Sequence, residues 1–62
     1  MTYIVEYERK LSDGRIRGIT LSTAFRESAA DLYDTAKASR GVVWARWYQV
    51  GVDGDIAEHW AN

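Results

Sequence analysis

The chain has 62 residues, a net charge of −1 and eight aromatic residues, and it contains neither cysteine nor proline. A chain of this length supports one domain and one core, so residues 1–62 are expected to form a single compact domain. The absence of cysteine excludes disulfides and thiolate metal sites and fits a cytoplasmic location, and no apolar run approaches the roughly 20 residues of a membrane span.

The first predicted element is a half-buried strand over residues 3–11, where apolar and polar side chains alternate. The apolar positions are Tyr3, Val5, Tyr7 and Leu11, and the polar ones are Glu6, Glu8 and Lys10. Glu6 and Glu8 are expected to face solvent and to pair with Arg15 or Arg17 on the neighbouring strand.

A hairpin turn is predicted at Ser12-Asp13-Gly14, because Asp-Gly is a strong turn pair. The second strand runs from Arg15 to about Thr23. Its alternation slips at Gly18, which predicts a β-bulge there.

A helix is predicted between Phe25 and Arg40, starting near residue 25–27. Its start has two possible caps, Thr23 or a capping box of Ser28 with Asp31, and Gly41 stands where a left-handed C-terminal cap belongs. The apolar stripe of this helix consists of Phe25, Ala29, Leu32, Tyr33 and Ala36.

The third strand, residues 42–50, is apolar on both sides. Alternation places Val43, Ala45 and Trp47 on one face and Val42, Trp44, Tyr48 and Val50 on the other. A turn at residues 51–55 and a short strand from Ile56 to Ala61 follow.

These elements predict an α+β fold, in which a four-stranded antiparallel sheet (β-β-α-β-β) carries one helix on one face. The helix stripe covers one face of the third strand and leaves the other set of aromatic side chains without cover. Either Trp47 with Val43 or Trp44 with Tyr48 is then left uncovered.

Catalysis and cofactor binding have little support in the sequence. His59 is the only histidine, and no nucleophile motif, phosphate loop or metal-ligand spacing accompanies it. Asp53-Gly54-Asp55 lacks the further ligands of a calcium loop and is interpreted as a turn. We therefore expect a non-enzymatic protein without a cofactor or metal.

Two binding surfaces are predicted instead. Trp, Tyr and Arg are enriched at protein-binding hot spots, which makes Trp44, Arg46 and Tyr48 candidates for contact with a partner protein or with a second copy of the chain. The competing prediction is a nucleic-acid-binding module built on the basic hairpin of residues 9–17. Its candidate residues are Arg9, Lys10, Arg15, Arg17 and Arg46.

The order of strand hairpin, helix and strand hairpin in fewer than seventy residues, without proline or cysteine, resembles that of some small phage-encoded inhibitors of bacterial immunity, the anti-CRISPR proteins. The resemblance lies in architecture, so no functional residue is carried over. It implies an inhibitor that occupies a surface of a CRISPR effector complex. The acidic residues Glu27, Asp31 and Asp34 on the exposed side of the helix would then meet a basic, nucleic-acid-binding groove.

Overall fold

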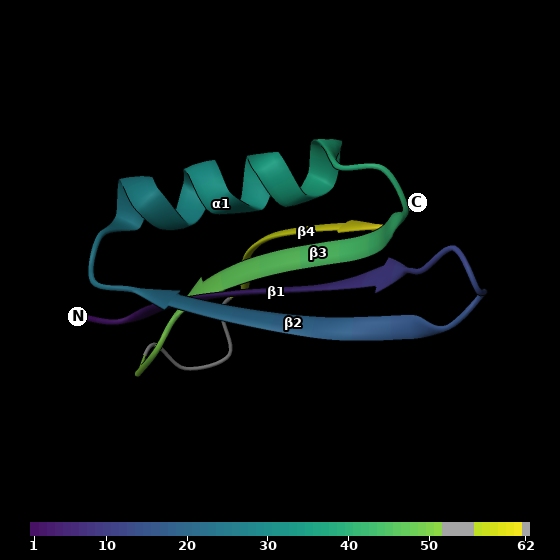
Figure 1. Ribbon diagram of the computed structural model, residues 1–62. Helices are drawn as coiled ribbons and strands as arrows, with labels where there is room; N and C mark the ends of the chain where they lie inside the picture. Colours follow the sequence, from purple (N-terminus) through teal and green to yellow (C-terminus); the bar gives the residue numbers. More distant parts are fainter. Residues whose placement is uncertain (52–55, 62) are drawn as a thin grey trace.

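The computed structural model of the chain describes residues 1–51 and 56–61 (Figure 1). Its elements are, in chain order, β1 (Tyr3–Lys10), β2 (Ile16–Thr23), α1 (Arg26–Ala38), β3 (Val42–Gln49) and β4 (Ile56–Ala61). The strands form one antiparallel sheet in the order β2-β1-β3-β4. The predicted α+β fold is therefore confirmed, although residues 52–55 of the predicted second turn lie outside the described residues.

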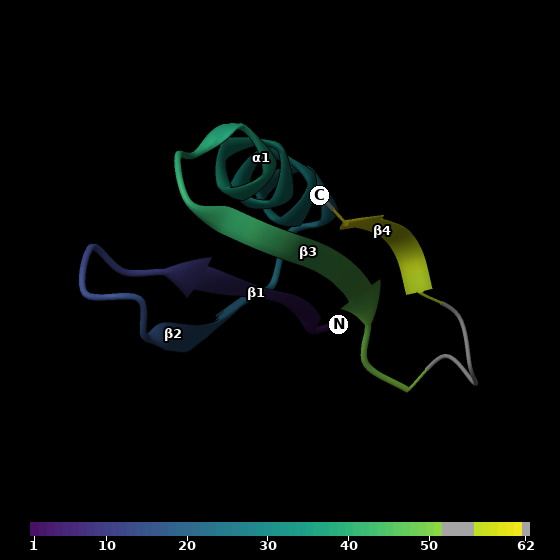
Figure 2. The ribbon, with the colours of Figure 1, turned by 90° about the vertical axis from the view of Figure 1, so that its right-hand side faces the viewer.

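The helix α1 covers one face of the sheet and leaves the other open (Figures 1 and 2). Viewed along its axis, α1 sits over β3, while β2 projects away from it (Figure 2). No helix in the described part of the chain is long and apolar enough to cross a membrane.

The hairpin of β1 and β2 has an unbroken register from Tyr3 opposite Thr23 to Lys10 opposite Ile16. Its loop closes where the Leu11 N–H donates to the Arg15 carbonyl at 2.7 Å, and Gly14 adopts the left-handed conformation with φ 88°. The predicted turn is confirmed.

The predicted bulge at Gly18 is wrong, because the register of β2 does not shift there. Regular alternation instead points Ile16 to the other face of the sheet from Ile19 and Leu21, and Ile16 is 58% exposed. Leu11, predicted as the last apolar position of the first strand, lies beyond the end of β1 and is also exposed.

A bulge occurs in β3 instead. Glu8 stands opposite Trp44 and Arg9 opposite Val42, so Val43 has no partner on β1. The extra residue re-phases the alternation and turns Val42 towards the helix with Ala45 and Trp47. The prediction that Val43 shares this face was therefore wrong.

The helix begins at Arg26, within the predicted range. Phe25 is extended, and its N–H donates to Thr23 Oγ1 at 3.2 Å, whereas Ser28 and Asp31 lie inside the helix and form no capping box. The helix ends at Ala38, so Gly41 is not its C-terminal cap but stands directly before β3 with φ 87°.

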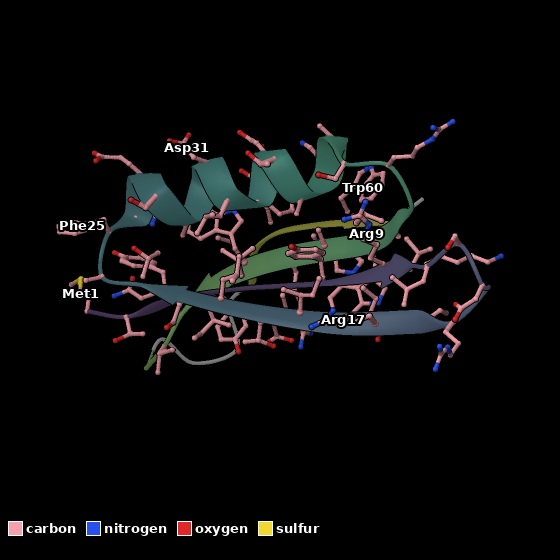
Figure 3. The ribbon with its side chains drawn as sticks, in the orientation of Figure 1. Met1, Arg9, Arg17, Phe25, Asp31 and Trp60 are labelled. Carbon is pink, nitrogen blue, oxygen red and sulfur yellow. The ribbon has the colours of Figure 1, made fainter. Side chains whose placement is uncertain are left out.

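The core lies between α1 and the covered face of the sheet. Its buried members are Tyr3, Val5, Ala29, Tyr33, Ala36, Val42, Ala45 and Trp47, and Leu32 and Trp60 pack against them. Phe25 was predicted as part of the helix stripe, but it precedes the helix and is 68% exposed (Figure 3). No polar or charged side chain among the described residues belongs to the buried set.

The junction at Gly41 should be sensitive to substitution. A Cβ at Gly41 would lie 2.9 Å from the Lys10 carbonyl oxygen and would occupy a left-handed backbone. Gly41→Ala is therefore expected to lower the free energy of unfolding by about 2 kcal/mol or more, measured by urea denaturation.

Two other glycines serve as controls. Gly14 shares the left-handed conformation but has open space around a Cβ, so Gly14→Ala should cost only about 1 kcal/mol. Gly18 has neither constraint, and Gly18→Ala should be neutral or slightly stabilising. Equal losses in Gly41→Ala and Gly14→Ala would show that the close approach to Lys10 has no energetic weight.

Candidate functional site

The face of the sheet opposite α1 is termed the open face. Because the side chains of Val5 and Trp47 point to the helix, their neighbours in each strand point away from it. The structure thus resolves which aromatic set stays uncovered: it is the pair Trp44 and Tyr48. The described side chains of the open face are Ile4, Glu6, Glu8, Lys10, Ile16, Thr20, Ser22, Trp44, Arg46, Tyr48, His59 and Ala61.

Glu6 is the centre of a hydrogen-bond network on the open face. Arg46 stands directly opposite Glu6 in the register, and its Nη2 donates to Glu6 Oε2 at 2.9 Å. The Tyr48 hydroxyl donates to Glu6 Oε1 at 2.7 Å. The side chains of Arg46 and Glu6 are 36% and 21% exposed, so this ion pair is partly shielded from water. The predicted pairing of Glu6 with Arg15 or Arg17 was wrong, because Thr20 is its neighbour on β2.

The network shifts the ionisation of both acidic members. The hydrogen bonds from Tyr48 and then from Arg46 lower the pKa of Glu6 below its ordinary value of 4.5. The hydrogen bond to Glu6, followed by burial, raises the pKa of Tyr48 above its ordinary 10.0. At neutral pH the carboxylate is therefore charged and the phenol is a neutral donor.

Aromatic rings flank the guanidinium of Arg46 on both sides. Its central carbon lies 5.6 Å from the centroid of the Trp44 ring and 5.9 Å from that of the Tyr48 ring, within range of cation–π attraction. On β4, His59 stands opposite Arg46, and its ring stacks on Trp44 at a centroid distance of 6.3 Å. Trp44, Arg46, Tyr48 and His59 thus form one continuous ridge across two strands.

The ridge borders a shallow, open hollow lined by Trp44, Arg46, His59 and Ala61. These groups offer ring faces and a cation for binding. Among residues 1–51 and 56–61, no three histidine, cysteine, aspartate or glutamate side chains come together as metal ligands. The arrangement favours contact with another surface through stacking and hydrogen bonds.

The five residues predicted to bind nucleic acid do not share one surface. Arg46 lies on the open face, bonded to Glu6. Arg15 stands at the hairpin tip, where its Nε lies 2.6 Å from Asp13 Oδ2. Arg9 and Arg17 stand opposite each other on the helix side of the sheet, whereas Lys10 points to the other side.

The acidic residues Glu27, Asp31 and Asp34 are exposed, as expected. Asp31 points away from the sheet in Figure 3, and Asp34 Oδ1 lies 3.7 Å from Lys37 Nζ. These residues stand on the helix, on the opposite side of the molecule from Trp44 and Tyr48. A flat partner surface therefore cannot contact both predicted protein-binding sets at once.

Sequence reasoning missed Glu6 and His59 as members of the site. Both depend on strand order, since they reach Arg46 and Trp44 only when β1 and β4 flank β3. The sequence pattern did identify the centre of the ridge, because Trp44 and Tyr48 each stand two positions from Arg46 on the same strand.

A scan against protein-family models, a search of curated proteins and a search of solved structures found no match to this chain. The geometry of the described residues is therefore the basis for any functional inference.

Replacing the central carboxylate tests the network. Glu6→Gln should lower the pKa of Tyr48 towards 10.0, because the charged acceptor is lost. Tyrosine ring signals followed by NMR during an alkaline titration measure this shift. Tyr33, whose pKa is raised chiefly by burial, is the internal control and should titrate as in the unmodified protein.

The same network makes stability depend on pH. Since the pKa of Glu6 is lowered on folding, its contribution is present above 4.5 and is lost as the pH falls through the lowered value. Urea denaturation should therefore show a smaller acid-induced loss of stability in Glu6→Gln than in the unmodified protein. Identical pH profiles would contradict this role for Glu6.

Proposed function

We propose that this protein is a non-enzymatic interaction module that binds a partner protein through its open face. The observation that supports the proposal is the ridge on the uncovered side of the sheet, where Glu6 holds Arg46 and Tyr48 in place. Trp44 and Tyr48 would supply the main apolar contact, and Arg46 would direct the orientation of the partner.

The composition of the ridge suits protein contact. Tyrosine, tryptophan and arginine are the residues most enriched among hot spots. Here they stand on strands and contact one another already, so little side-chain freedom is left to lose on binding. A standard interface takes about 800 Å² from each partner, which is under a fifth of the 4399 Å² that this chain exposes.

The open face is less suited to nucleic acid. Arg46 is neutralised by Glu6, and Glu8 on the same strand face adds a second carboxylate. The open face therefore has no net positive charge with which to attract phosphates.

The architectural resemblance to anti-CRISPR proteins makes a CRISPR effector complex the first partner to test. In that case the protein would be a phage or mobile-element inhibitor that acts in the cytoplasm of a bacterium. A second copy of the chain is the competing occupant of the open face.

Truncation of the ridge tests the proposal. The partner is first captured from a lysate of the host bacterium with the unmodified protein, and purified effector complex is tested in parallel. Trp44→Ala should then weaken binding to the captured partner by about 2 kcal/mol, or roughly thirtyfold in Kd, measured by calorimetry.

Phe25→Ala is the matched control, because Phe25 is a large exposed aromatic residue outside the open face. It should leave Kd unchanged. A triple variant of Glu27→Gln, Asp31→Asn and Asp34→Asn tests the acidic helix surface separately. Loss of binding in the triple variant but not in Trp44→Ala would overturn the proposal, as would a dimeric mass in sedimentation that Trp44→Ala abolishes.

A further inference from the structure

A second surface lies at the end of the sheet where β1 ends and β3 begins. It is a broad, open hollow of about 560 Å³ and is termed the basic cleft. Its lining residues are Arg9, Lys10, Leu11, Ser12, Arg40 and Gly41. Three of them are cations, and none of the described lining residues is acidic.

The backbone brings these cations together from distant parts of the chain. The Lys10 N–H donates to the Gly41 carbonyl at 2.8 Å, which joins the end of β1 to the segment after the helix. The close approach at Gly41 leaves no space for a side chain there, and the Arg9 side chain lies beside it. Arg40 is thereby placed next to Arg9 and Lys10, and Arg9 rises on the helix side of the sheet (Figure 3).

The charge at this end is not compensated within the described residues. Arg9 stands directly opposite Arg17 on β2, and like charges in that position are destabilising. The ion pairs between described residues use Arg15, Lys37 and Arg46. None of them includes the four cations Arg9, Lys10, Arg17 and Arg40. A chain with a net charge of −1 thus concentrates unpaired positive charge in one place.

We propose that the basic cleft binds the phosphodiester backbone of a nucleic acid. Guanidinium groups match the geometry of phosphate oxygens. Two of the three lining cations, Arg9 and Arg40, are arginines, and a third arginine, Arg17, stands opposite Arg9 on β2. Arg17 on β2 and Arg9 on β1 share the helix side of the sheet, and Arg9 lines the cleft together with Arg40. These three arginines form a stripe suited to successive phosphates. An open hollow also admits a polymer that continues beyond it.

This site differs from the predicted basic hairpin. Arg15 and Arg46 are not part of it, because both are paired with carboxylates elsewhere. Arg40, which the hairpin prediction omits, takes their place. The inference is independent of partner binding through the open face.

The test is fluorescence anisotropy with a labelled single-stranded DNA oligonucleotide of mixed sequence, over a series of salt concentrations. The unmodified protein should bind at low salt. Arg9→Gln and Arg40→Gln should each reduce the slope of log K against log salt by about 0.7, the value for one lost phosphate contact on a single strand. The double variant should bind about tenfold more weakly at low salt.

Arg15→Gln is the matched control, since it removes the same charge from an ion-paired arginine on the same hairpin. It should reduce the slope much less than Arg9→Gln. Absence of binding by the unmodified protein at low salt would overturn the proposal. So would equal effects of Arg15→Gln and Arg9→Gln, or equal binding of a polyglutamate peptide of the same charge.

A second measurement guards against loss of folding. Because Arg17 opposes Arg9, Arg17→Gln should raise the Tm of the free protein while it weakens binding to the oligonucleotide. A lower Tm would show that Arg17 stabilises the fold. The cluster of cations would then have a structural role, which would contradict the proposal that it is maintained to bind phosphate.

Discussion

The structure depends on the coverage that one helix can provide. The 13 residues of α1 bury three side chains, Ala29, Tyr33 and Ala36, against a sheet of four strands. The helix lies over β3 and buries Trp47 and Val5, but it covers only one face of the sheet. Everything on the other side of the sheet must be stable in contact with water. The Glu6 network contributes to that stability, because the carboxylate accepts hydrogen bonds from Arg46 Nη2 and the Tyr48 hydroxyl while the Trp44 and Tyr48 rings lie against the guanidinium.

Much of this fold could be predicted from the sequence, because local patterns determine it. Alternation identified the strands, the Asp13-Gly14 pair identified the hairpin, and apolar spacing identified the helix. The errors occurred where pairing between strands decides the outcome. Val42 faces the helix only because the bulge at Val43 shifts the phase, and Gly18 needs no bulge because Ile16 tolerates exposure.

The candidate site shows the same division. Trp44, Arg46 and Tyr48 could be named from their spacing on one strand. Their partner Glu6 is forty residues from Arg46, and the two meet only because β1 and β3 are neighbours in the sheet. The basic residues show the opposite case, because residues that are close together in the sequence lie apart in the structure. Arg15 turned to Asp13 and Arg9 turned to the helix side, where Arg40 lies beside it.

The last turn of the helix adds to the positive charge at one end of the molecule. The first turn carries Glu27, while the last turn carries Lys37 and leads to Arg40 at the end where Arg9 lies (Figures 1 and 3). The end of the molecule that holds Arg9, Lys37 and Arg40 therefore gathers positive charge, although the net charge of the chain is −1. A highly charged partner would rotate such a molecule during approach, so that one end arrives first. Ionic strength would then act mainly on the rate of association, and much less on the lifetime of the complex once it has formed.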